Sequence, residues 1–211
     1  MPNETNKSIV CAITGGIGAG KSTVAELVKE MGYVVISSDD NAKNIMASNQ
    51  EIKSKLINEF GEKVYNENGE INKEYLSNIV FGPSEKHQTA LLKLNSIVHP
   101  FVIEFMIKEV SKYEEKGEPF IFVESALTYE AGLEDGFDYV IVVDTLEDIV
   151  IDRVKQRSGL SAEDIMLRIN QQIPSEKKKH QADFVIENNG SPEELKKSVN
   201  IIIKIITQQS N

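Results

Sequence analysis

Ten residues near the start of the chain combine glycines, a lysine and hydroxyl side chains at a spacing suited to phosphate binding. They fit the pattern G-x-x-x-x-G-K-[ST], and the positions predicted to contact a nucleotide are Gly16, Ile17, Gly18, Ala19, Gly20, Lys21, Ser22 and Thr23. Glycines let consecutive backbone N–H groups turn inward around an anion. Lys21 would place its charge on the β- and γ-phosphates, and the Ser22 hydroxyl would bind a phosphate-bound Mg²⁺. The stretch therefore predicts a P-loop that binds a nucleoside triphosphate.

The segments on either side of this loop support that interpretation. Residues 9–13 are a short apolar run typical of a strand, and residues 23–29 have helical periodicity that ends at Gly32. A strand, a glycine loop and a helix, in that order, are the setting that a P-loop requires. A dinucleotide-binding G-x-G-x-x-G loop is disfavoured, because Lys21 follows Gly20 and no glycine stands at the third required position.

Further apolar runs predict the rest of a sheet. Residues 33–36, 120–123, 139–143 and 184–186 are nearly continuously apolar, as parallel strands covered on both faces are. Helical patterns separate them, so we predict the α/β class, with a three-layer P-loop kinase fold around a parallel five-stranded sheet. Thr145, Ser161 and Ser191 are each followed three residues later by an acidic residue and are therefore predicted helix N-caps.

Two segments interrupt the alternation of strands and helices. Residues 39–119 are mostly helical in pattern and too long for a crossover, so we interpret them as an inserted, acceptor-binding helical subdomain. Residues 156–181 are charged and amphipathic, and we interpret them as a lid. The nucleotide-binding core would then consist of residues 8–38 and 120–208.

Composition narrows the classes of partner. A net charge of −10 disfavours a nucleic-acid binder and an anionic membrane surface, since both require a surplus of Lys and Arg. The single cysteine, Cys11, falls in an apolar strand and excludes a disulfide framework. The polar N-terminus does not resemble a signal peptide, and no apolar run approaches membrane-spanning length. We expect a cytoplasmic protein that is a monomer or a small homo-oligomer.

The P-loop classes differ in the residues that accompany the loop. The guanine motif N-K-x-D and the D-x-x-G of GTPase switches are missing, and so is a strand ending in Asp-Glu, as motors carry. A small-molecule kinase needs a carboxylate near the γ-phosphate and mobile cations. Asp39 follows the second predicted strand and is the candidate base, with a helix-capping role and the neighbouring Asp40 as alternatives. Arg157, Arg168 and Lys177–Lys179 are candidate lid cations.

Several segments, in order, resemble the dephospho-CoA kinase family over nearly the whole chain. These are the loop at 14–23, VISSDDNAK at 35–43, LNSIVHP at 94–100, ESALTYE at 124–130, RINQQ at 168–172 and ADFVIENNGS at 182–191. They are similar to the family's V-I-D-A-D-x-x-A-R, L-N-x-x-x-H-P, acidic-x-P-L-L-F-E, R-I-x-x-Q and A-D-x-V-I-x-N-x-G-S segments. The resemblance implies phosphorylation of the ribose 3′-hydroxyl of dephospho-CoA by ATP with Mg²⁺, giving CoA and ADP.

The resemblance also implies roles for further residues. Glu124 would reach Mg²⁺ through water, although a solvated strand-end acid would look the same. His99 would contact the CoA-side substrate or be structural, next to a proline that suggests a helix break. Asn189 would lie at the adenine, in a turn that Asn-Gly chemistry alone also explains. Lys178 aligns with a lid arginine, although a run of lysines is usually a solvated face.

The chain also departs from the family pattern. Ser37 replaces the first Asp of D-A-D, Lys43 replaces an Arg and Ala126 replaces a proline. Lysine supplies charge without the bidentate fork of arginine, which weakens the transfer of lid roles.

Two other functions remain as alternatives. The first is another small P-loop kinase, for a nucleoside, nucleotide, shikimate-like or sugar acceptor; residues 39–119 contain no arginine to hold a nucleotide acceptor's phosphate. The second is a nucleotide-dependent switch or binding protein without catalysis, against which Asp39 and the missing guanine motif argue.

Overall fold

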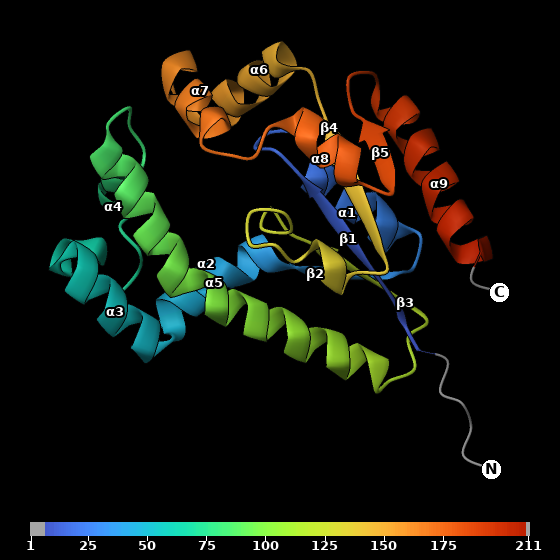
Figure 1. Cartoon of the computed structure of the whole chain (residues 1–211), viewed down its shortest axis with the longest axis horizontal. Coiled ribbons are helices and arrows are strands. Elements are labelled where there is room, and N and C mark those ends of the chain that lie inside the picture. Colours follow the sequence, from blue (N-terminus) through green and yellow to red (C-terminus); the bar gives the residue numbers. More distant parts are fainter. Residues whose placement is uncertain (1–6, 210–211) are drawn as a thin grey trace.

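Five parallel strands form a sheet at the centre of the molecule (Figure 1). The computed structural model describes residues 7–209, apart from the side chains of Asp39, Asp40 and Gln209. The strands are β1 (Ile9–Gly15), β2 (Val34–Ser37), β3 (Phe120–Glu124), β4 (Tyr139–Asp144) and β5 (Phe184–Glu187), in the order β2-β3-β1-β4-β5. The predicted α/β class and the parallel five-stranded sheet are confirmed.

Nine α-helices surround the sheet in the described part of the chain. They are α1 (Lys21–Glu30), α2 (Ser38–Ser48), α3 (Gln50–Phe60), α4 (Lys73–Val80), α5 (Glu85–Glu114), α6 (Glu147–Ser158), α7 (Ala162–Asn170), α8 (Ser175–Gln181) and α9 (Pro192–Gln209). Short 3₁₀ turns lie at Glu62–Val64 and Glu134–Gly136.

Alternate residues of the strands feed two separate cores. In β1, Cys11 and Ile13 pack with α1 and α9, whereas Val10 packs with the helices between β2 and β3. In β3, Phe122 joins the first cluster and Val123 the second. This alternation is the period-two pattern of a strand that is covered on both faces, and it produces the three layers that the sequence predicts.

The strands extend past the apolar runs that predict them. β2, β3, β4 and β5 each continue by one polar residue, to Ser37, Glu124, Asp144 and Glu187. These residues still pair with the neighbouring strand, for example Ser37 with Glu124 and Asp144 with Glu187. The carboxyl edge of the sheet therefore carries a row of polar side chains, where ligands bind in open parallel sheets.

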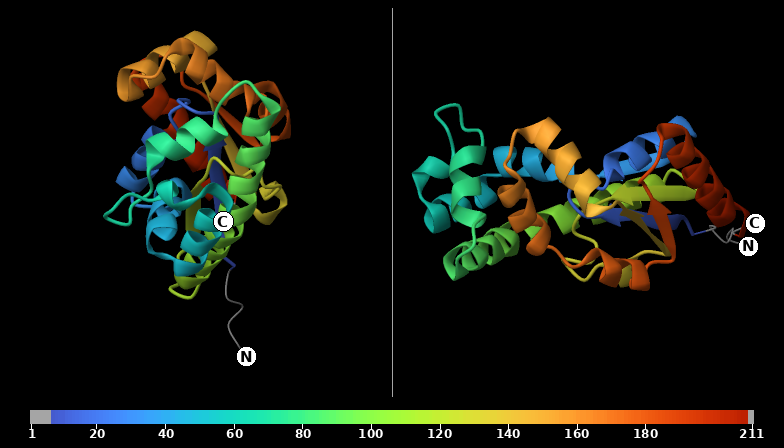
Figure 2. Two further views of the ribbon diagram at one scale, coloured as in Figure 1. Left: turned by 90° about the vertical axis from the view of Figure 1, so that its left-hand side faces the viewer. Right: turned by 90° about the horizontal axis from the view of Figure 1, so that it is seen from above.

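The segment between β2 and β3 contains α2 to α5; α3 and α4 lie at one end of the molecule, and α5 runs from there alongside the sheet (Figure 2). The predicted helix break at Pro100 is wrong, because α5 continues through this proline over its 30 residues. Proline costs a helix the backbone hydrogen bond that its missing N–H would donate. Burial of Val98 and Val102 on either side of Pro100 supports the helix there. The boundaries of a separate subdomain at 39–119 stay a prediction.

By length and apolar composition alone, α5 is also long enough to cross a membrane, the one such helix within residues 7–209. Our expectation from the sequence that no run approaches this length is thereby corrected. Val98, Val102 and Met106 of α5 are buried in the cluster that includes Val10, and further apolar residues of the helix, such as Leu94 and Phe101, are partly buried against it.

Helix caps explain where α7, within the predicted lid segment, and α9 begin. The Ser161 hydroxyl accepts the Asp164 N–H at 3.1 Å, and Ser191 forms a reciprocal box with Glu194, so both predicted caps are confirmed. The cap predicted at Thr145 is wrong. Its hydroxyl donates instead to the Ala19 carbonyl at 2.9 Å, and α6 begins after Leu146 without a side-chain cap.

Candidate active site

The P-loop connects β1 to α1, and two of its glycines are packed closely against neighbouring side chains. A Cβ on Gly18, whose φ is +72°, would lie 2.7 Å from the Val154 side chain. A Cβ on Gly20, whose φ is +97°, would overlap the Asn188 amide. Glycine is therefore required both for backbone conformation and for space. Helix α1 begins at Lys21 without a side-chain cap, so its first N–H groups are available to an anion.

Lys21 and Ser22 lie where the loop becomes helix. The Lys21 side chain is buried, and its Nζ donates to the Gly16 carbonyl at 3.1 Å, which holds the charge over the loop. The Ser22 hydroxyl donates to Glu124 Oε1 at 2.6 Å. The Ser37 hydroxyl donates to Glu124 Oε2 at 2.9 Å. Glu124 is only 4% exposed, so these two hydroxyls satisfy a carboxylate that burial would otherwise penalise.

The backbone of Asp39 lies in the first turn of α2, directly after β2. Its side chain lies outside the described part of the structure, and so does that of Asp40. The turn itself is fixed to the sheet, because the Ser38 hydroxyl donates to the Glu124 carbonyl at 2.9 Å. The Asn41 amide donates to the Ser37 carbonyl at 2.6 Å. The role of Asp39 as a base stays a prediction.

A cavity of about 870 Å³, here called the P-loop cavity, opens beside the loop. The predicted nucleotide contacts Ile17, Gly18, Gly20, Lys21, Ser22 and Thr23 line it, together with Ser37, Lys43, Glu124, Ala126, Arg153, Arg157, Gln172, Asn188 and Gly190. Gly16 and Ala19 line a smaller cavity of about 320 Å³ on the other side of the loop, here called the small cavity. The loop thus lies between two cavities, and the larger one is lined by Lys21, Lys43, Arg153 and Arg157.

Arg153 is a site residue that the sequence did not single out, and Asn188 was noted only as part of the turn expected at the adenine. The Asn188 amide donates to the Ala19 carbonyl at 2.8 Å and so fixes the loop to the end of β5. Arg153 Nη2 donates to the Asn188 carbonyl at 3.0 Å. A signal for Arg153 was its position four residues before Arg157 on one helix. The predicted Asn189 accepts the Leu146 N–H at 2.8 Å, which places its side chain at the start of α6.

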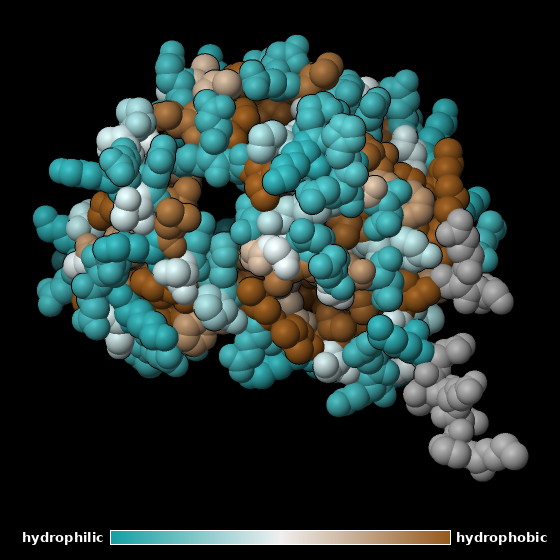
Figure 3. All heavy atoms as spheres, viewed as in Figure 1, coloured by the Kyte–Doolittle hydropathy of each residue, from teal (hydrophilic) through white to brown (hydrophobic). Residues whose placement is uncertain are grey.

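A second large cavity, of about 890 Å³ and here called the α5 cavity, lies between the helices after β2 and the sheet. Figure 3 shows the molecule hollowed between these two parts. Its wall is largely apolar, with Met46, Ala47, Ile71, Leu76, Val80, Phe81, Leu94, Val98, Val102 and Leu127. Lys43, Lys73, Arg157 and Arg168 add positive charge. The cavity therefore suits a ligand that is anionic in one part and apolar in another.

His99 and Arg168 both line the α5 cavity. His99 Nε2 is buried and has no hydrogen-bond partner among the described residues. Burial lowers the pKa of His99, with nearby Glu130 opposing that shift, so the neutral imidazole is favoured. Arg168 Nη2 donates to Ser77 Oγ at 2.8 Å, and the guanidinium lies 4.3 Å from the Phe81 ring centre. Arg168 thus connects α7 to α4 rather than to the P-loop.

Arg157 lines both large cavities. Its guanidinium has no hydrogen-bond or ion-pair partner among the side chains that the structure describes. An arginine without a fixed partner at the junction of two cavities is available to an anionic ligand. The structure therefore brings the predicted Arg157 to the site, while its catalytic role stays a prediction.

Lys178 lies away from both large cavities. It is 1% exposed, its Nζ is 2.5 Å from Glu130 Oε1, and it lines the small cavity. This ion pair attaches α8 to the segment after β3. The solvated face suggested by the lysine run is therefore wrong for Lys178, while its role as a lid cation stays a prediction.

Replacing Lys178 with methionine should lower the free energy of unfolding by about 3 kcal/mol, because Glu130 would lose its ion-pair partner in a mostly buried site. Urea unfolding measures this value. The exposed neighbour Lys177 provides the matched control, and Lys177→Met should change stability little. Adding Glu130→Gln to Lys178→Met should restore part of the loss; equal stability of the two single methionine variants would contradict a stabilising pair.

Comparison with known proteins places this site in a family. The sequence model of the dephospho-CoA kinase family matches residues 9–194. A curated dephospho-CoA kinase from Staphylococcus aureus is 37% identical over 195 residues, which are 92% of each chain. The chain belongs to the dephospho-CoA kinase family.

Solved structures agree with this membership. A structure from Thermus thermophilus superposes with a TM-score of 0.75 at 32% identity, covering 94% of this chain and 98% of the other. The dephospho-CoA kinase from Campylobacter jejuni gives a TM-score of 0.68 at 28% identity, covering 96% and 98%. The family's kinases are ATP-dependent, and its L-N-x-x-x-H-P segment corresponds here to Leu94, Asn95, Val98 and His99 on the wall of the α5 cavity.

Proposed function

We propose that this chain transfers the γ-phosphoryl group of ATP to the ribose 3′-hydroxyl of dephospho-CoA, giving CoA and ADP. This reaction is the last step of CoA synthesis. One observation carries the proposal beyond family membership: the P-loop cavity and the α5 cavity share Lys43 and Arg157 on their walls. Two cavities that meet at shared cations can hold donor and acceptor with their phosphates adjacent.

The chemistry of the α5 cavity supports dephospho-CoA as the acceptor. A nucleobase and a pantetheine arm present apolar surface, and a diphosphate joins them. Apolar residues such as Met46, Leu76 and Phe81 would contact the apolar parts, and Lys73 and Arg168 would bind the diphosphate. Neutral His99, with its unpartnered Nε2, would form a hydrogen bond to the substrate.

In the transfer, the acceptor 3′-oxygen forms a bond to the γ-phosphorus as the bond from that phosphorus to the β–γ bridging oxygen breaks. The hydroxyl proton goes to Asp39, and ADP leaves with the electron pair of the broken bond. Lys21 would neutralise charge on the β- and γ-phosphoryl oxygens, and Arg157 would do so from α6. The loop residues Gly18 to Ser22 would bind the phosphates through backbone N–H groups.

We propose that Mg²⁺ accompanies ATP. Among the described residues, no group of three or more His, Cys, Asp or Glu side chains could hold a metal ion by itself. Ser22 and the buried Glu124 nevertheless supply oxygen ligands of the kind that Mg²⁺ prefers, next to the phosphate site. Ser22 Oγ would bind the ion directly and Glu124 through water. When bound, the ion neutralises charge on the phosphoryl oxygens.

The net charge and the single cysteine bear on the partners and on the cellular location of the protein. We propose that the enzyme acts in the cytoplasm as a monomer or a small homo-oligomer, without nucleic acid or membrane as a partner. The net charge of −10 supports the absence of polyanionic partners. Burial raises the pKa of Cys11 to about 12, so this thiol would be inert at neutral pH.

The test is release of ADP from ATP and Mg²⁺ with each of several acceptors. Turnover should occur with dephospho-CoA, with CoA as the product, and should be at background with adenosine, AMP, shikimate and gluconate. Turnover with one of those controls alone would make the chain a different small-molecule kinase. Tight ATP binding without transfer to any acceptor would instead favour a nucleotide-binding switch.

A further inference from the structure

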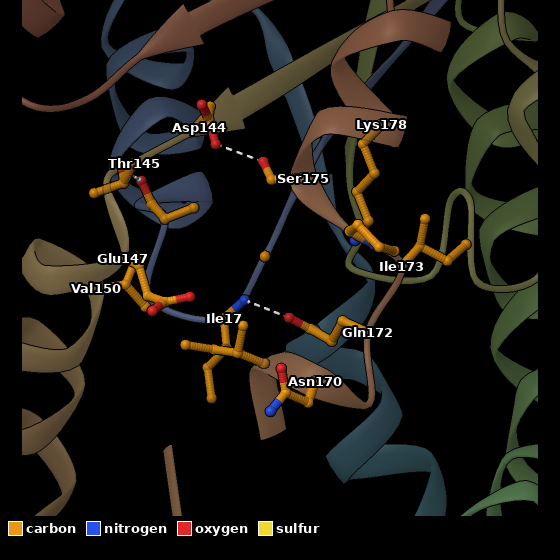
Figure 4. A pocket seen from close by; sticks show the side chains of 14 residues that line it. Ile17, Asp144, Thr145, Glu147, Val150, Asn170, Gln172, Ile173, Ser175 and Lys178 are labelled. Carbon is orange, nitrogen blue, oxygen red and sulfur yellow. Dashed lines mark hydrogen bonds between the residues drawn. The ribbon is translucent and has the colours of Figure 1, made fainter. Parts of the chain in front are cut away.

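One side chain from the lid segment reaches the P-loop directly. Gln172 lies in the connection between α7 and α8, and its Oε1 accepts the Ile17 backbone N–H at 2.9 Å, as Figure 4 shows. The two residues are 155 positions apart in the chain. Gln172 also lines both the P-loop cavity and the small cavity, so its amide lies at the wall between them.

The hydrogen bond to Ile17 determines which end of the amide remains available. An N–H group needs an acceptor, so Oε1 must face Ile17 and Nε2 must face away from it. Nε2 carries two donor hydrogens and has no acceptor among the residues that the structure describes. A donor of this kind next to a phosphate-binding loop is suited to an anionic oxygen.

The charges of the two cavities indicate where that anion would lie. The small cavity is lined by the carboxylates of Asp144 and Glu147 and by Lys178, whose charge is already paired with Glu130, so it offers little attraction to a phosphate. The P-loop cavity is lined by Lys21, Lys43, Arg153 and Arg157 together with the acid Glu124, so positive charge predominates there. The electrostatics therefore favour an anion on the P-loop side of Gln172.

The position of Lys21 indicates which phosphate is close to Gln172. A P-loop lysine reaches the β- and γ-phosphates, whereas the backbone of the loop cradles the α- and β-phosphates. Lys21 Nζ donates to the carbonyl of Gly16, the residue before Ile17. The end of the loop that Gln172 contacts is thus the end nearest the γ-phosphate.

We propose that Gln172 recognises the γ-phosphate of ATP through a hydrogen bond. Its Oε1 holds the Ile17 N–H, and its Nε2 donates to a γ-phosphoryl oxygen, so the lid segment is attached to the loop more firmly with a triphosphate bound than with a diphosphate. This inference rests on the assignment of the P-loop cavity to ATP. It makes Gln172 a residue that distinguishes the substrate ATP from the product ADP.

Isothermal titration of two variants with β,γ-imido-ATP and with ADP, each with Mg²⁺, tests the proposal. Gln172→Ala should raise the Kd for the imido analogue about tenfold, the typical effect of losing a hydrogen bond to a charged group, and should change the Kd for ADP less than about threefold. Gln172→Glu should weaken the analogue more than alanine does, because its second oxygen would face the γ-phosphate while the first still accepts from Ile17. Gln181→Glu, at an exposed position of α8, is the control with the same change of charge.

The possible results distinguish recognition of the γ-phosphate from simple support of the loop. If the glutamate variant binds both nucleotides with wild-type Kd values, Gln172 only supports the loop. If the Kd values for both nucleotides rise equally, Gln172 does not recognise the γ-phosphate. Either result overturns the proposal. Wild-type protein that bound neither nucleotide would instead overturn the ATP site itself. If the alanine variant fails to fold, Gln172→Asn, with a shorter amide, should show the same selective loss.

Discussion

Replacing Lys21 with methionine should reduce kcat/KM for phosphoryl transfer by about 1,000-fold or more, the scale expected when a cation is lost from the transferring phosphoryl group. Lys21 is buried and is held over the loop by its hydrogen bond to the Gly16 carbonyl. Methionine keeps most of the apolar stem, so the variant removes the charge with little change in packing. Steady-state ADP release with saturating dephospho-CoA measures the effect.

The matched control for Lys21 lies on the same helix. Lys29 of α1 is exposed and pairs with Glu26 at 2.8 Å, so Lys29→Met removes an equal charge without touching the site. Surface ion pairs of this kind contribute little, and this control should retain wild-type turnover and stability. A Lys21→Met variant with more than about a tenth of wild-type kcat/KM would contradict the proposed transition-state role.

The strands and the P-loop could be predicted because each depends on residues that are close together in the sequence. Buried parallel strands are continuous apolar runs, and the P-loop needs glycines at fixed intervals, so both are evident in the sequence. The polar residues that end β2, β3 and β4 break the apolar pattern, yet their backbones still pair at the sheet edge. The strand ends were therefore underestimated at Ser37, Glu124 and Asp144, which all contribute to the cavities or their surroundings.

The errors at the site come from contacts between residues far apart in the chain. Thr145 fits a helix cap by spacing, but its hydroxyl donates to Ala19, 126 residues away. Lys178 resembles one residue of a solvated run, but it pairs with Glu130, 48 residues away. Such contacts have no periodicity and no short motif, so they cannot be inferred from a single sequence. The substrate was predicted from the resemblance to a family, because related sequences share such contacts even where no local pattern indicates them.

Replacing Asp39 with asparagine should lower kcat by about 100- to 10,000-fold, the range for removing a general base, while ATP binding stays within a few-fold of wild type. The position of the Asp39 backbone supports this role. Ser37 lines the P-loop cavity, Ser38 lines the α5 cavity, and Asp39 follows both in the first turn of α2. The hydroxyls of Ser37 and Ser38 bind this turn to Glu124, so the position is fixed at the boundary between donor and acceptor.

Single-turnover transfer, measured by CoA formation from preformed complexes of enzyme, ATP and dephospho-CoA, separates chemistry from product release. Asp40→Asn is the control, since it makes the same isosteric change at the next residue. The base assignment requires that Asp39→Asn loses transfer and Asp40→Asn keeps it. The reverse result would move the role to Asp40, and full transfer in both variants would mean that this turn positions the acceptor without accepting its proton. In that case the two serines and Glu124 would still order the turn, but the hydroxyl proton would leave to solvent or to a phosphoryl oxygen.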